Sequence, residues 1–166
     1  MLNYQIVPIA EEHIAGFWAA LDSVAREHKY IGCLEGPPIE TTRAFVLENI
    51  KGHWPHFVAL SEGTVIGWCD ITSLSRPIFA HSGVLGIGLL APYRGQGIGE
   101  ALMRAALDQA KSVGLTRVEL TVRENNKRAI VLYEKLGFVV EGLHRNAVRV
   151  DKIYENLISM ALLFEK

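Results

Sequence analysis

Residues 85–102 read LGIGLLAPYRGQGIGEAL, and this stretch decides the fold. An apolar run of strand character ends at a proline, and a glycine-dense turn carrying Arg94 leads into an amphipathic helix. Gly95, Gly97 and Gly99 lack the Cβ atoms that would keep a ligand away from the backbone. The free N–H groups at the start of the helix, together with the arginine, suit a phosphate group. The stretch predicts an anion-binding turn; a plain turn that uses glycine for its geometry is the alternative.

The composition is that of an ordinary globular domain. The 166 residues are 49% hydrophobic and 21% charged, and 17 Lys and Arg stand against 18 Asp and Glu. Without an excess of basic charge we expect no nucleic acid and no membrane as a partner. Cys33 and Cys69 make no disulfide framework, and residues 1–10 lack the basic start of a signal peptide. We expect one soluble, cytoplasmic domain over residues 1–166.

Hydrophobic periodicity and turn residues predict the element order βααβββαβαββ. Before the glycine turn we expect a strand (4–9), a helix (11–29), a helix capped by Thr41 or Thr42 and ending near 51, a hairpin (57–71) and a further strand. After the turn we expect a helix ending near 113, a strand (117–122) and a helix that starts at Asn125 or Asn126 and ends at Gly137. Two strands (139–141 and 152–163), joined around 145–151, complete the series. This order predicts a mixed α/β fold, with helices on both faces of one sheet.

Two nucleotide-binding fingerprints fail against the glycine turn. A dinucleotide fold needs a strand that runs directly into G-x-G-x-x-G, but here the third glycine comes one place early and residues 91–94 intervene. Glu119 has the offset of the acidic ribose ligand, yet it falls in mid-strand. A P-loop is excluded because no Lys-Ser/Thr pair follows the glycines.

The residues instead resemble the GNAT (GCN5-related N-acetyltransferase) superfamily. RGQGIG at residues 94–99 matches the R/Q-x-x-G-x-G/A signature of that family. LTVRENNKRAIVLYEKLGF at residues 120–138 is similar to its second motif, N-x-x-A-x-x-L-Y-x-x-x-G-F, and DKIYENLISM at 151–160 is similar to its closing strand. The resemblance covers about the C-terminal half. It implies a single GNAT-like domain with a central, twisted, mostly antiparallel sheet.

The resemblance also implies a reaction, in which an amine attacks acetyl-CoA directly, and a set of site residues. The backbone of Ile87, Gly88 and Leu89 would pair with the pantetheine arm, and the Leu89 N–H would polarise the thioester carbonyl. Asn126 would hydrogen-bond the arm or act only as a helix cap, and Tyr133 would protonate the CoA thiolate or be only a core aromatic. The residues implied for the pyrophosphate are Arg94, Gly95, Gln96, Gly97, Ile98, Gly99 and Glu100.

The general base is not specified by the motifs. Relatives often carry a Glu before the Asn motif, but Thr121 occupies that place here. Glu119 lies on the same strand face and is the expected base. His81 and Glu35 are weaker alternatives, and for each of the three the other reading is a surface or strand-edge polar group. We expect no metal site, because His53 and His56 have no third ligand nearby.

These observations predict an acetyl-CoA-dependent N-acetyltransferase that acts on the primary amine of a small molecule, either amino-acid-like or a polyamine. A protein N-terminal or lysine acetyltransferase is one alternative. A non-catalytic acyl-CoA-binding module is another, and the missing Glu at Thr121 favours it. Exposed edge strands suggest a homodimer.

Overall fold

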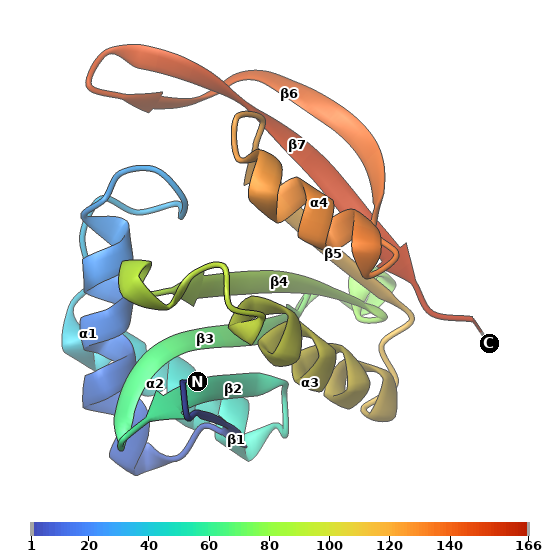
Figure 1. Ribbon diagram of the computed structural model, residues 1–166. Helices are drawn as coiled ribbons and strands as arrows, with labels where there is room; N and C mark the ends of the chain where they lie inside the picture. Colours follow the sequence, from blue (N-terminus) through green and yellow to red (C-terminus); the bar gives the residue numbers. More distant parts are fainter. Residues whose placement is uncertain (1, 166) are drawn as a thin grey trace. The chain divides into compact units, whose positions relative to one another are not determined.

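The computed structural model describes residues 2–165, and its elements follow the predicted order (Figure 1). The strands are β1 (Gln5–Pro8), β2 (His56–Ser61), β3 (Thr64–Ser73), β4 (Ser82–Leu89), β5 (Arg117–Arg123), β6 (Val139–Val150) and β7 (Ile153–Leu163). The helices are α1 (Ile14–Ala25), α2 (Ile39–Lys51), α3 (Ile98–Ser112) and α4 (Lys127–Lys135). Short 3-10 turns occupy Glu11–His13, Pro77–Phe79 and Ala91–Tyr93. Across residues 2–165, no helix combines the length and apolar character needed to cross a membrane.

The seven strands follow the order β1-β2-β3-β4-β5-β7-β6. Strands β4 and β5 run parallel, whereas the pairs β1–β2, β2–β3, β5–β7 and β6–β7 are antiparallel. The expected mixed α/β fold with a mostly antiparallel sheet is thereby confirmed. The contacts divide the chain into two compact units. The first holds the chain up to Thr72 and Leu85–Gly114, and the second holds Ser73–Val84 and the chain from Leu115 onward.

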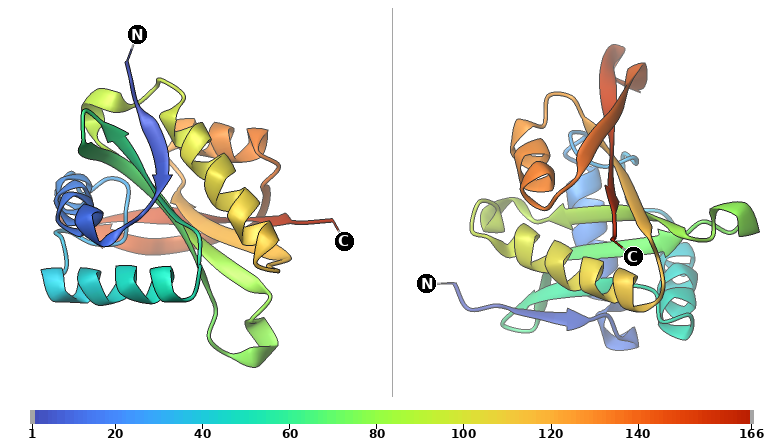
Figure 2. Two further views of the ribbon diagram at one scale, coloured as in Figure 1. Left: turned by 90° about the horizontal axis from the view of Figure 1, so that it is seen from below. Right: turned by 90° about the vertical axis from the view of Figure 1, so that its right-hand side faces the viewer.

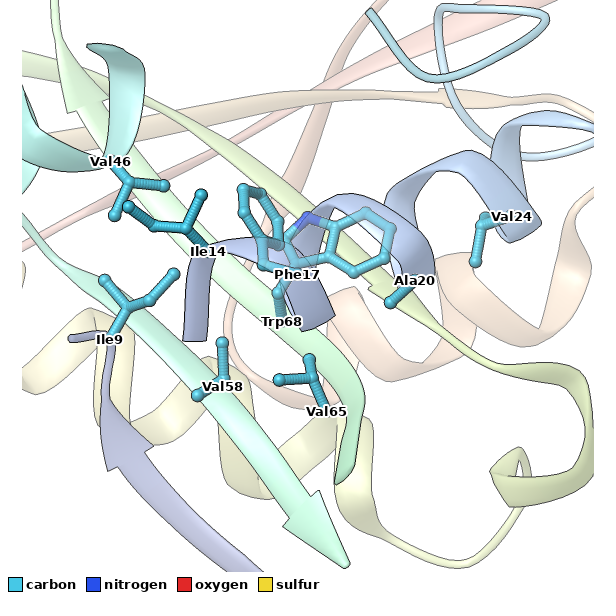
Figure 3. Close-up of a cluster of buried hydrophobic side chains, with 9 residues drawn as sticks. All are labelled: Ile9, Ile14, Phe17, Ala20, Val24, Val46, Val58, Val65 and Trp68. Atoms are coloured by element: carbon cyan, nitrogen blue, oxygen red, sulfur yellow. The ribbon is translucent and has the colours of Figure 1, made fainter. Parts of the chain in front are cut away.

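In the first unit, helices lie on both faces of the strands, with α1 and α2 on one face and α3 on the other (Figure 2). The core between α1, α2 and the strands is a cluster of buried apolar side chains (Figure 3). The Phe17 ring packs edge-on against Trp68, with their centroids 5.6 Å apart. Since Val58 is the cross-strand partner of Trp68, the two side chains share the face that α1 covers.

In the second unit, α4 ends as the sequence predicts. Gly137 has a left-handed φ of +98°, and the Phe138 N–H donates to the Tyr133 carbonyl at 3.0 Å. The Gly137 N–H donates to the Glu134 carbonyl at 3.0 Å. These two bonds make a Schellman motif. The motif fixes the last turn of the helix that carries Tyr133.

Three predicted boundaries are wrong. Helix α2 begins at Ile39 after Pro38, so neither Thr41 nor Thr42 is its cap. The first helix is shorter than expected and covers Ile14–Ala25. The closing hairpin turns at Asp151 and Lys152, both with positive φ, so β6 extends far beyond the predicted 139–141.

Candidate active site

The glycine turn between β4 and α3 is open at its backbone. Gly95 and Gly97 both adopt left-handed φ values, +76° and +84°. Gly97 is the N-cap of α3, and no side chain caps the helix there. A Cβ placed on Gly97 would meet no atom within 4 Å. The first N–H groups of α3 therefore lack a side-chain acceptor, which is the arrangement that an anion fits.

Arg94 is held at the end of β4 by three hydrogen bonds. Its Nε donates to the Leu89 carbonyl at 2.9 Å, and its two terminal nitrogens donate to the Glu27 carboxylate at 2.9 and 2.5 Å. The guanidinium also lies over the Tyr30 ring, 4.5 Å from its centroid. Its hydrogen bonds to the Glu27 carboxylate lower the pKa of Glu27. Because a guanidinium has five N–H donors, this pairing leaves Arg94 further donors for a phosphate.

The end of β4 nearer the turn has glycines on the face that looks toward α1, Gly86 and Gly88, and side chains of the adjacent strand β3 lie over them. A Cβ on Gly88 would overlap the Trp68 indole ring. A Cβ on Gly86 would lie 3.5 and 3.6 Å from the two carboxylate oxygens of Asp70. Trp68 and Asp70 are two residues apart on β3 and point to the same side. Side chains from β3 thus form the surface above this part of β4.

The predicted site residues are divided between the two units. The first unit holds the whole predicted donor strand and anion turn, namely Ile87, Gly88, Leu89, Arg94, Gly95, Gln96, Gly97, Ile98, Gly99 and Glu100. The second unit holds Glu119, Asn126 and Tyr133. The residues predicted for the pyrophosphate and for backbone pairing with the arm are therefore in one continuous strand, turn and helix start, whereas Asn126 and Tyr133 belong to the other unit.

Asn126 and Tyr133 belong to α4. The Asn126 side-chain oxygen accepts a hydrogen bond from the Ala129 N–H at 3.3 Å, so Asn126 is the N-cap of the helix. Tyr133 is 7% exposed, and its ring lies 6.1 Å from that of Phe138. Both side chains thus have structural roles, and their predicted roles toward the donor stay predictions.

The three candidate bases from the sequence have different surroundings. The Glu119 carboxylate forms an ion pair with Arg117 at 3.0 Å. Glu35 is exposed and lies 3.6 Å from Arg26. His81 is exposed. The two glutamates each have an arginine beside them, and the histidine is open to solvent. None of the three is therefore a buried, unpaired base.

Sequence reasoning missed two charged residues beside the predicted donor strand. Asp70 is half-buried on β3, and burial raises its pKa from 3.8 to about 7. The sequence does contain a signal for Asp70, because it is the one charged residue in the apolar run of residues 65–71. Glu27 lies 67 residues from its partner Arg94. Nothing in the local sequence indicates that pairing.

In the second unit, a polar hollow of about 430 Å³ was also missed. Asn156 organises it, since its amide donates to Glu124 at 2.8 Å and its side-chain oxygen accepts from the Asn146 N–H at 2.8 Å. The buried Arg123 pairs with Glu155 at 3.2 Å. The hollow therefore has a polar lining from the end of β5 and from the half of the β6–β7 hairpin nearer its turn.

Comparison with known proteins identifies the family. Residues 18–138 match the profile described as the acetyltransferase (GNAT) family. This match covers well over half of the chain, so the protein belongs to the GNAT acetyltransferase family. The resemblance seen in the two motifs is confirmed.

Two similar curated proteins are N-acetyltransferases. N-alpha-acetyltransferase RimI of Mycobacterium tuberculosis is 40% identical over 109 residues, which cover 65% of this chain and 66% of that protein. L-amino acid N-acetyltransferase AaaT of Escherichia coli is 34% identical over 103 residues, covering 58% and 64% respectively. The matches thus span just under two thirds of the length of these relatives.

Solved structures have the same fold over nearly the whole chain. A GNAT acetyltransferase from Streptococcus pneumoniae superposes with a TM-score of 0.90 at 25% identity, covering 98% of this chain and all of that one. The Salmonella typhimurium protein yncA, solved with its cofactor acetyl-CoA, gives a TM-score of 0.93 at 18% identity, covering 99% and 95%. This second likeness concerns the fold alone.

Proposed function

We propose that the protein is an acetyl-CoA-dependent N-acetyltransferase whose acceptor is the primary amine of a small, amino-acid-like molecule. One observation carries the donor assignment. The uncapped start of α3, preceded by two left-handed glycines and Arg94, lies one short 3-10 turn after a strand whose α1 face has no side chains at Gly86 and Gly88. Such an arrangement accepts an anion at one end and an extended chain along the strand.

The residues of the first unit fit acetyl-CoA in this way. The N–H groups around Gly97 and the free donors of Arg94 hold the pyrophosphate, and the backbone of residues 87–89 pairs with the pantetheine arm. When bound, acetyl-CoA supplies an activated acetyl thioester. A backbone N–H of residues 87–89 is the donor to the thioester carbonyl, and Tyr133 is the predicted donor of a proton to the departing thiolate.

The names of the similar proteins support an α-amino group as the acceptor. RimI is an N-alpha-acetyltransferase and AaaT an L-amino acid N-acetyltransferase. A second candidate acceptor is therefore the N-terminus of a peptide, which the 40% identity to RimI favours. A polyamine has no comparable support from these names. Dimer formation stays a prediction from the sequence.

Two measurements test this function. Calorimetry with acetyl-CoA should give a dissociation constant near the micromolar range, and absence of binding contradicts the assignment. An amine panel, read by mass spectrometry and CoA release, should include free amino acids, their α-N-blocked forms, short peptides and a polyamine. We expect acetylation of amino acids and none of the blocked forms. Binding of acetyl-CoA without release of CoA across the panel would instead indicate a non-catalytic acyl-CoA-binding module.

Tyr133→Phe tests the predicted proton donor. Loss of the hydroxyl should lower kcat by about 100-fold or more, with little change in acetyl-CoA affinity. Calorimetry and steady-state kinetics measure the two effects separately, and Tyr4→Phe is a matched control in the other unit. Unchanged turnover would remove Tyr133 from this role.

A further inference from the structure

Asp70 is a sheltered carboxylate beside the predicted donor strand. It is half-buried, and its two oxygens lie 3.5 and 3.6 Å from the position that a Cβ on Gly86 would take. Among residues 2–165, no hydrogen bond or ion pair to this carboxylate is found, in contrast to Glu119 and Glu27. A carboxylate kept from water without a cation beside it is costly, and a cationic ligand would relieve that cost.

Among the described residues, the groups that the structure places beside Asp70 carry no positive charge at pH 7. On the neighbouring strand its cross-strand partner is His56, whose side chain shares its face. His56 is buried and its pKa is lowered by burial to about 4, so its ring is neutral at pH 7. The side chains of α1 and α2 that contact His56 are Phe17, Phe45 and Asn49, all uncharged. Cys69, the residue before Asp70, is buried, and burial raises the pKa of its thiol.

The His56 ring offers a second polar group on this face. Its Nδ1 lies 3.1 Å from the Asn49 amide, whereas its buried Nε2 has no hydrogen-bond partner among the described residues. Buried polar atoms without partners are uncommon in native structures. The Asp70 carboxylate and the His56 Nε2 are thus neighbouring polar groups without a hydrogen-bond partner among the described residues.

We infer that Asp70 binds the ammonium form of the acceptor amine and takes its proton, so that the free amine attacks the acetyl donor. The inference rests on the proposed function. The pyrophosphate and the thioester are at opposite ends of the pantetheine arm. If the turn at Gly97 holds the pyrophosphate and residues 87–89 pair with the arm, the arm runs along β4 away from the turn, toward Gly86 and therefore toward Asp70.

The step balances in protons and bonds. The ammonium gives one proton to the Asp70 carboxylate, and the freed lone pair forms the N–C bond of the amide while the thioester C–S bond breaks. The nitrogen loses a second proton, the departing sulfur gains one to become the CoA thiol, and Asp70 releases its proton to solvent. The products are the amide, the thiol and one proton. A base with a pKa of about 7 suits this step at neutral pH.

Asp70→Asn tests the inference, with Asp108→Asn on the exposed face of α3 as the matched control. The free protein provides a readout independent of activity. Carboxyl carbon NMR should show one aspartate that titrates near pH 7 in the native protein and in Asp108→Asn, and that is missing in Asp70→Asn. Addition of an accepted amine should shift this signal. Glu119→Gln serves as the competing-base variant.

Kinetics complete the test. In Asp70→Asn we expect kcat/KM to fall by about 100-fold or more and to lose its rise near pH 7, with acetyl-CoA affinity unchanged. Wild-type kcat/KM with an unchanged pH profile overturns the inference, as does the same loss in Glu119→Gln without one in Asp70→Asn. If the native protein binds acetyl-CoA but acetylates no amine, the proposed function fails instead, while the NMR titration still decides whether an amine binds at Asp70.

Discussion

Arg94 has two partners in the structure that the family motif does not indicate. Its Nε bonds the last carbonyl of β4 at Leu89, and its other nitrogens pair with Glu27 beyond the end of α1. Arg94 therefore links the end of β4 to the segment that follows α1. Under the proposed function, Arg94 acts on the donor either by contacting the pyrophosphate or by fixing the end of β4. The two roles predict different losses of donor affinity when Arg94 is replaced.

Arg94→Ala distinguishes the roles when two donors are compared. If Arg94 contacts the pyrophosphate, the affinity for acetyl-CoA should fall by about tenfold or more, since a charge-assisted hydrogen bond is worth about 1.5–3 kcal/mol. S-acetyl-pantetheine lacks the pyrophosphate and should bind both proteins equally. Calorimetry measures both affinities, with Arg43→Ala on the exposed face of α2 as control. An equal loss for the two donors would show that Arg94 acts only through the strand end.

At the scale of elements, α4 combines a structural cap and a predicted ligand contact in one residue. Asn126 accepts from the Ala129 N–H, and substituting such a cap by alanine costs about 1 kcal/mol. The resemblance assigns the same side chain to the pantetheine arm. Because an aspartate caps a helix as well as an asparagine does, the two functions can be separated.

We expect Asn126→Ala to lower the free energy of unfolding by about 1 kcal/mol and Asn126→Asp to leave it nearly unchanged. If the amide also contacts the donor, both variants should bind acetyl-CoA several-fold more weakly. Urea unfolding and calorimetry on the same samples give both quantities. Native-like affinity in Asn126→Asp would leave Asn126 as a helix cap alone.

The order and type of the elements could be predicted from the sequence because each long element has a clear period or a clear stop. Gly137 and Phe138 predicted the Schellman end of α4. The start of α2 was missed because Pro38 precedes it with no capping side chain. The Thr42 hydroxyl is buried and has no hydrogen-bond partner among residues 2–165. The hairpin turn was missed because Asp151 and Lys152 adopt positive φ without glycine.

The geometry of the glycine turn was predictable, because glycines at fixed spacing indicate a left-handed backbone. The side chains that face Gly86 and Arg94 were not. Asp70 and His56 come together only through the register of β2 and β3, and Glu27 reaches Arg94 across 67 residues. Such pairings depend on tertiary packing, which cannot be predicted from the local sequence.

At the scale of the whole molecule, Asp70 and Glu27 give opposite contributions to the pH dependence of stability. The pKa of Asp70 is raised to about 7, so the folded state holds this proton more tightly than the unfolded state does. Asp70 therefore lowers stability as the pH rises from about 4 to about 7, by at most about 1.4 kcal/mol per pH unit. Glu27, whose pKa is lowered, stabilises the fold above its ordinary value of 4.5 and loses this effect as the pH falls.

Asp70→Asn should accordingly be more stable than the native protein above pH 7 and nearly equal to it at pH 4. Urea unfolding between pH 4 and pH 9 measures the difference, and Asp108→Asn should show no such trend. A constant difference across this range would mean that Asp70 has an ordinary pKa in the folded protein.

The glycines of β4 have a consequence for how this protein can change. Because Gly86 and Gly88 contribute no side chains, the surface above them belongs to Trp68 and Asp70 on the adjacent strand. Under the proposed function, one strand recognises the donor through its backbone while another shapes the acceptor side. New acceptors can then be gained by substitutions in β3 at positions other than Asp70, with the machinery for the shared donor left intact.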